Sequence, residues 1–139
     1  MTTSDSPSGP ATSAGSTSEV LPSDILHDYC MAKPGATFDH VFGPQTTVYR
    51  VMNKVFLLVG QDARPQYATF SYDPEESLLL RETYESVVPG YYANKRLCNT
   101  VYYTGEVSVE QSLEWVDASY DIVVAKLPRK LRDQLHADG

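Results

Sequence analysis

Apolar residues recur at helical spacing directly after Ser23, and this pattern predicts a first helix. Ser23 is expected to cap its start, and Pro34 with Gly35 is expected to stop it. The apolar positions that share one face are Ile25, Leu26, Tyr29, Cys30 and Ala32. One side of this helix should therefore pack against a core.

The strongest helical signal lies after Asp73. Asp73 can cap the helix, and Pro74 suits the first helical position. Glu75 and Glu76 complement the positive end of the helix dipole. Apolar positions then repeat at Leu80, Tyr84, Val87 and Val88. The pattern predicts a second helix that continues to the Pro89-Gly90 pair.

A third helix is expected after Ser108, because Ser108 and Gln111 have the spacing of a capping box. Its apolar face consists of Leu113, Val116, Tyr120, Val123, Val124 and Leu127. Pro128 breaks this helix, and residues 129–136 can form a short last helix with basic residues on its exposed side.

Aromatic and β-branched residues dominate the stretches between these helices, which is typical of strands. These stretches are residues 37–44, 46–60, 66–72 and 99–107. Asn53-Lys54 has the length of a two-residue hairpin turn, and Thr104-Gly105 marks another turn. The order is helix, three or four strands, helix, one or two strands, and helices. It predicts an α+β domain in which an antiparallel sheet packs against helices in two layers.

The first 22 residues are almost wholly Ser, Thr, Gly, Pro and Ala and show no apolar periodicity. Such a segment buries too little apolar surface to offset the entropy of ordering. We therefore expect a disordered tail over residues 1–22 and a single domain over residues 23–139. A domain of that length buries a sizeable core without disulfide or metal support.

The chain of 139 residues is acidic, with 18 Asp and Glu against 11 Lys and Arg and a formal net charge of −7. An acidic globule repels phosphate at long range, which counts against general nucleic-acid binding but still allows a local basic patch. No apolar run has the length of a membrane span, and the N-terminus lacks the pattern of a signal peptide. We expect a cytoplasmic protein.

Catalytic signatures are missing from the sequence, which has no nucleophile elbow, phosphate-cradling glycine loop or paired-histidine motif. Cys30 and Cys98 lie far apart without a secretory signal, so reduced thiols are expected. Only His27 and Cys30 are spaced for a metal, which is too few for zinc. We expect no enzyme, metal or cofactor. A nucleophilic Cys98 is a hypothesis that depends on the nearby Lys95 and Arg96.

Asn94, Lys95 and Arg96 form the first candidate site, in a loop before the late strand. One interpretation is an anion or phosphate contact, since arginine offers a bidentate fork, lysine a point charge and asparagine an amide. In the other, Asn94 satisfies loop backbone groups while Lys95 and Arg96 pair with acids such as those at 82 and 85. The sequence leaves both interpretations open.

Further cations are candidates for the same anion or nucleic-acid site. Lys33 lies at the end of the first helix, where it can also complement the helix dipole. Residues 126–132, which include Lys126, are the densest positive stretch in the chain. The candidate set is Lys33, Arg50, Lys54, Asn94, Lys95, Arg96, Arg129 and Lys130.

Several motifs in a fixed order resemble the MmcQ/YjbR family. They are KPG at 33–35, DPE at 73–75, LRETY at 80–84, PGYYANKRLCNTV at 89–101 and SYDIVVAKLP at 119–128. The resemblance spans residues 21–132 and is specific as a set. It implies a small bacterial α+β domain, similar to the secretion chaperone-like and CyaY-like folds. The chain departs from the usual family pattern at Tyr92, Leu97 and Cys98, where His, His and Trp are common.

Members of this family are commonly labelled DNA-binding because of their fold, so the resemblance implies a DNA-binding or regulatory module. A protein or peptide interaction module is the alternative, favoured by the acidic composition, the ten tyrosines and the likeness to secretion chaperones. A third hypothesis is a small-anion-binding enzyme that uses Lys33 with residues 94–96.

Overall fold

A computed structural model describes residues 21–90 and 98–138, with side chains as far as residue 136. The helices are α1 Pro22–Met31, α2 Pro74–Thr83, α3 Val109–Ala125 and α4 Arg129–Asp138. The strands are β1 Ala36–Asp39, β2 Thr46–Val51, β3 Lys54–Gly60, β4 Tyr67–Ser71, β5 Val87–Pro89 and β6 Cys98–Tyr102. This order of elements is the predicted one.

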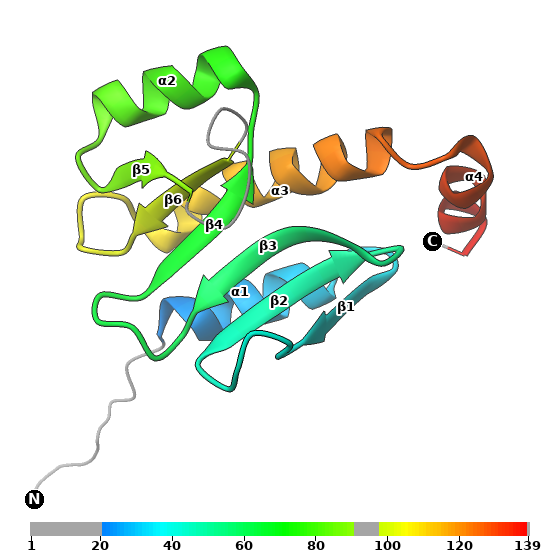
Figure 1. Ribbon diagram of the computed structural model, residues 1–139, viewed down its shortest axis with the longest axis horizontal. Coiled ribbons are helices and arrows are strands. Elements are labelled where there is room, and N and C mark those ends of the chain that lie inside the picture. The colour runs from blue at the N-terminus through cyan, green and yellow to red at the C-terminus, as the bar shows by residue number, and fades with distance from the viewer. Residues whose placement is uncertain (1–20, 91–97, 139) are drawn as a thin grey trace, which may run out of the picture.

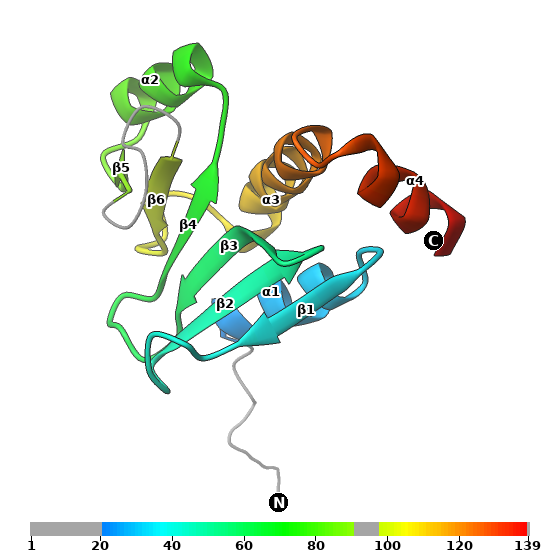
Figure 2. The ribbon, with the colours of Figure 1, turned by 45° about the vertical axis from the view of Figure 1, so that its right-hand side comes forward.

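The six strands form one sheet in the spatial order β1-β2-β3-β4-β6-β5, and every neighbouring pair is antiparallel (Figure 1). Helices α1 and α3 lie side by side against one face of the sheet, and α2 lies over β5 and β6. Helix α4 extends from the end of α3 at the far side of the molecule, as Figure 2 also shows. The predicted α+β architecture is therefore confirmed.

Helix α1 begins earlier than predicted. Its N-cap is Leu21, which makes no side-chain capping bond, and Pro22 occupies the first turn. Proline pre-sets the helical dihedral there and has no N–H to satisfy, so the helix needs no serine cap. Ser23 instead bonds to the Gln66 amide, with the Ser23 N–H donating at 3.0 Å and the Ser23 hydroxyl accepting at 3.1 Å.

Helix α2 begins as predicted and ends earlier than predicted. The Asp73 carboxylate accepts from the backbone N–H groups of Glu75 and Glu76, both at 3.1 Å. The chain becomes extended at Tyr84, and β5 pairs Val87 with Val101 of β6. The continuation of this helix to Pro89 was wrong, because two β-branched valines gain a sheet partner that the helical pattern does not reveal.

The hairpin between β2 and β3 turns at Met52 and Asn53, one residue before the predicted turn. Both residues have positive φ, 47° and 72°, as a two-residue turn of matching twist requires. The register then shifts, because Tyr49 pairs with Leu57 while Arg50 pairs with Val55. This bulge leaves Phe56 without a partner residue on β2, and it changes which side chains point inward.

The core lies between the sheet and helices α1 and α3. Trp115 of α3 stacks on Phe70 of β4 with ring centroids 5.5 Å apart, and Phe56 meets the Tyr120 ring edge to face at 5.3 Å. Aromatic pairs of this kind add to the stabilisation from apolar burial. The bulge at Phe56 makes the second contact possible, since Phe56 and Leu57 are both buried.

Ser119 of α3 fixes the point where β3 and β4 separate. The β3–β4 pairing ends at Leu57 and Phe70. Beyond it, the fully buried Ser119 hydroxyl donates to the Phe56 carbonyl at 2.5 Å and accepts from the Ser71 N–H at 2.9 Å. Buried backbone groups need such partners, so this side chain substitutes for the next bonds of the ladder.

The last two helices follow the predicted break at Pro128. At the start of α3, the Ser108 hydroxyl accepts from the Gln111 N–H at 3.0 Å, but the Gln111 side chain donates to Tyr84 instead of closing the capping box. Leu135 of α4 is buried in the core. Among the described helices, none combines the length and apolar composition needed to cross a bilayer.

Candidate functional site

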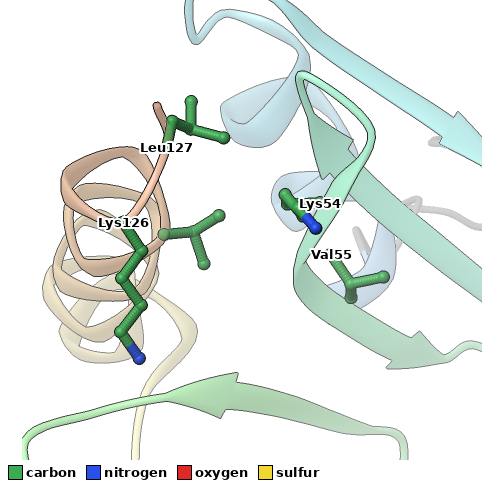
Figure 3. A pocket seen from close by; sticks show the side chains of 5 residues that line it. Lys54, Val55, Lys126 and Leu127 are labelled. Atoms are coloured by element: carbon green, nitrogen blue, oxygen red, sulfur yellow. The ribbon is translucent and has the colours of Figure 1, made fainter. Parts of the chain in front are cut away.

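Lys54 and Lys126 line one groove from opposite elements (Figure 3). Lys54 is the first residue of β3, and Lys126 is the C-cap of α3. The groove has a volume of about 330 Å³, and its apolar lining consists of Val55, Val123 and Leu127. Two exposed cations beside an apolar surface suit a ligand that has both an anionic group and an apolar part.

Local backbone structure sets both lysines in place. The turn at Met52 and Asn53 presents Lys54 at the exposed tip of the hairpin, and the bulge that follows leaves Val55 39% exposed on the groove. On the opposite side, the Lys126 N–H bonds to the Val123 carbonyl at 3.1 Å and closes α3. A cation at a helix C-terminus also complements the helix dipole, a role that requires no groove.

Both lysines keep their charge available. In the part of the chain that the structure describes, neither Lys54 nor Lys126 forms an ion pair or a side-chain hydrogen bond. Their exposure means that each ammonium is solvated and that a ligand carboxylate would replace water rather than a protein partner. The groove therefore brings together two cations that have no partner within the described residues.

Lys33, by contrast, is bound inside the protein. Its ammonium lies 2.5 Å from the Asp117 carboxylate, and it sits over the rings of Tyr29 and Tyr120 at 4.9 and 5.1 Å. The Tyr29 hydroxyl donates to the same carboxylate, and this hydrogen bond raises the pKa of Tyr29. Lys33 thus joins the turn after α1 to α3, and it is not free to bind an anion.

Arg50 is likewise paired. Its Nε donates to the Asp39 carboxylate at 2.7 Å, and this bond lowers the pKa of Asp39. A guanidinium N–H of Arg50 also reaches the Asn53 carbonyl in the hairpin turn at 3.4 Å. The pair supports the β1–β2 edge and the turn that carries Lys54.

The remaining candidates with described positions, Arg129 and Lys130, do not line the groove. Arg129 forms an exposed pair with Asp133 at 3.9 Å, and Lys130 is exposed on the first turn of α4. Asn94, Lys95 and Arg96 lie outside the described residues. Of the sequence candidates that the structure describes, only Lys54 lines the groove, and Lys126 was named only as part of the basic stretch.

Sequence reasoning missed the contact between Arg81 and Asn99. Arg81 of α2 donates to the Asn99 side-chain oxygen at 2.6 Å and to the Cys98 carbonyl at 3.3 Å. Asn99 is fully buried. Both residues belong to motifs that carry the family resemblance, LRETY and the NTV end of the long loop motif. These motifs therefore contain a contact that fixes α2 to β6.

A second polar pocket of about 330 Å³ lies between α1 and the β1–β2 edge. His27 shares a hydrogen bond of 2.9 Å with the Tyr49 hydroxyl, and His40 lies 3.3 Å from the Thr47 hydroxyl. Burial raises the pKa of Tyr49 strongly, so its hydroxyl stays protonated. Within the described ranges, no cluster of three His, Cys, Asp or Glu is arranged to hold a metal ion.

The two cysteines are free and lie on different elements, Cys30 on α1 and Cys98 on β6. Burial raises the pKa of the Cys30 thiol to about 12, which makes it a poor nucleophile at neutral pH. Cys98 is 8% exposed, and its sulfur lies 3.7 Å from the Ser71 hydroxyl. Its surroundings in the described structure are a strand and an apolar pocket.

Comparison with known proteins gives sequence relatives over most of the chain. A family model described as YjbR matches residues 31–122. The uncharacterized protein YjbR of Escherichia coli strain K12 is 34% identical over 110 residues, which cover 79% of this chain and 93% of that protein. The uncharacterized protein YbdF of Escherichia coli O157:H7 is 32% identical over 93 residues, which cover 67% and 75%.

Solved structures agree with this relationship. The crystal structure of DR2400 from Deinococcus radiodurans, described with the domain name DUF419, has a TM-score of 0.76 at 28% identity and covers 84% of this chain and 88% of its own. A Pseudomonas syringae protein, the structural genomics target PsR293, has a TM-score of 0.60 at 20% identity and covers 70% and 95%. At 20% identity, the Pseudomonas syringae protein shows only that the two chains share a fold.

Proposed function

The chain belongs to the YjbR family, and from that premise we propose that it is a protein-interaction module whose β3–α3 groove binds an extended acidic segment of a partner. The proposal includes the cytoplasmic location and the single domain over residues 23–139 that the sequence predicts. Relatives named YjbR and YbdF are described as uncharacterized, so the choice of ligand depends on the groove itself.

One observation carries the proposal: two lysines from different elements, neither of which has an ion pair within the described residues, line one groove in a chain of net charge −7. A carboxylate placed between Lys54 and Lys126 would form charge-assisted hydrogen bonds. The apolar lining would accept the aliphatic part of the same segment, as recognition grooves for extended peptides do. Because both lysines are exposed, salt should screen this attraction.

DNA binding is the other function that the family resemblance implies, and the exposed Arg129 and Lys130 of α4 favour it. Duplex DNA, however, presents regularly spaced phosphates along a convex surface and is held by several cations at once. Lys33 and Arg50 each contact a carboxylate, so neither is free to hold a phosphate. The groove geometry therefore supports an acidic peptide better than a duplex.

An NMR titration of ¹⁵N-labelled protein tests this proposal. The probe is a short capped peptide rich in glutamate and leucine, and the controls are the same peptide with glutamine for glutamate and a duplex oligonucleotide. We expect the acidic peptide to shift the amides of Lys54, Val55 and Lys126, and the glutamine peptide to bind about three- to tenfold more weakly. Equal shifts with both peptides, or saturable shifts with the duplex at these residues, would overturn the proposal.

A further inference from the structure

Val55 lines two cavities at once. It belongs to the groove between Lys54 and Lys126, and it also forms a wall of a separate pocket on the neighbouring part of the sheet. The second pocket has a volume of about 160 Å³. Its lining residues are Phe42, Val55, Leu58, Thr69, Phe70, Ser71 and Cys98. The cationic groove and this pocket therefore share one half-exposed lining residue.

The pocket exists because β3 and β4 separate at this point. Their pairing ends at Leu57 and Phe70, and the Ser119 hydroxyl takes the next backbone bonds from the α3 side. The bulge at Phe56 turns that ring into the core and leaves Val55 at the opening. The opening is therefore a consequence of how the hydrogen bonds between β3 and β4 end.

Burial along the pocket runs from an exposed mouth to a closed floor. Phe42 is 60% exposed and Val55 is 39% exposed, whereas Leu58 is 5% and Cys98 is 8% exposed. A volume of about 160 Å³ is close to that of the cavity of about 150 Å³ known to admit one benzene ring. The pocket therefore has room for a single aromatic or branched aliphatic side chain.

We propose that the partner segment carries an acidic residue next to one bulky apolar anchor residue. The carboxylate lies between Lys54 and Lys126, the chain passes Val55, and the anchor fills the pocket behind it. This inference rests on the proposed function and names the chemistry of the segment. Charge complementarity selects an acidic segment, and an apolar anchor within a polar surround is the usual source of affinity and specificity in such sites.

A peptide fits the two cavities better than a fatty acid does. The pocket floor is closed by buried side chains, so it accommodates one side chain and not a long acyl chain. Thr69 and Ser71 add hydroxyl groups to its lining, and Ser71 lies close to the Cys98 thiol. These hydroxyl groups can form hydrogen bonds with the backbone of a peptide, whereas an acyl chain has no group to bond with them.

Fluorescence anisotropy with labelled capped peptides tests the anchor. One peptide carries glutamate next to leucine, and a second has alanine in place of that leucine. We expect the loss of the leucine to weaken binding about tenfold or more, as burial of a branched side chain implies. Phe42→Ala should weaken the leucine peptide and leave the alanine peptide unchanged, because it removes one wall of the pocket.

Val41→Ala is the matched control, since Val41 is 64% exposed in the same loop and lines neither cavity. If binding needs the glutamate but not the leucine, this inference is overturned and the proposed function still stands. If binding does not need the glutamate, the inference and the proposed function are both overturned. Displacement of the leucine peptide by dodecanoate at equal concentration would assign the cavities to a lipid and overturn the peptide inference.

Discussion

Lys33, in the turn after α1, forms an ion pair with Asp117 of α3, and the Tyr29 hydroxyl of α1 donates to the same carboxylate. The Lys33 side chain is 16% exposed and the Asp117 side chain is 45% exposed. Lys33 belongs to the KPG motif, whose glycine has a φ of +72°. The lysine that the sequence presents as a candidate anion ligand is therefore part of the helix packing.

Replacement of Asp117 by alanine should lower the free energy of unfolding. Lys33 and Tyr29 would both lose their acceptor, and we expect a cost of about 1–2 kcal/mol, at the lower end because Asp117 is partly solvated. Urea unfolding measures this difference. Asp121→Ala on the exposed side of α3 is the control and should change the free energy by less than about 0.5 kcal/mol. Equal effects of the two substitutions would contradict the role of the pair.

Ser119→Ala should destabilise the junction of β3 and β4. The substitution leaves the Phe56 carbonyl and the Ser71 N–H without their partner, at a cost of about 1–3 kcal/mol. Hydrogen exchange gives a local measurement, because the Ser71 amide should exchange faster in the variant. Glu114→Ala, at an exposed position of the same helix, should leave that amide protected. An unchanged Ser71 exchange rate in Ser119→Ala would contradict the bridge.

Alkaline pH should weaken the fold through its buried tyrosines. Burial raises the pKa of Tyr103 from 10.0 to about 12. Below pH 10 the tyrosine is therefore protonated in the folded and in the unfolded protein, and its contribution to the free energy of unfolding is fully present. Between about pH 10 and 12 the unfolded state loses the proton first, and the free energy of unfolding falls by at most about 3 kcal/mol. Urea unfolding of Tyr103→Phe should show a shallower fall. A fall of the same slope would exclude Tyr103 as its source.

The two thiols should differ in reactivity. Burial holds the pKa of Cys30 near 12, whereas Cys98 lines a pocket that opens to solvent. At neutral pH we expect iodoacetamide to modify Cys98 before Cys30, and Cys30 only after unfolding. Mass spectrometry of the digested protein locates the modification. Faster modification of Cys30 in the native protein would show that the pocket beside Cys98 is closed to small molecules.

The order of elements could be predicted because local signals agree with the fold. Asp73 with Pro74 marks the start of α2, and Pro128 separates α3 from α4. Among the local predictions that were wrong, two failed because the deciding partner is distant in sequence. Val87 joins β6 rather than continuing a helix, and Ser23 bonds to Gln66 rather than capping. These contacts join residues that are too far apart in the sequence to affect the periodicity of a short window.

The candidate site was harder to predict than the fold. Charge alone marked Lys33 and Lys54 alike, although Lys33 has a carboxylate partner on α3 and Lys54 has none within the described residues. The groove needs Lys126 to face Lys54, a relation that depends on how α3 packs on the sheet and on the bulge beside Val55. Pairing between distant residues thus decides which cations are available.

The affinity of the glutamate and leucine peptide for a Lys54→Gln/Lys126→Gln variant tests the groove most directly. Isothermal titration calorimetry should show binding weakened about tenfold or more, because both charges facing the peptide carboxylate are removed. Lys130→Gln, which removes an exposed charge that is not part of the groove lining, should bind as the wild type does. Wild-type affinity in the double variant, or an equal loss in Lys130→Gln, would contradict a site between Lys54 and Lys126.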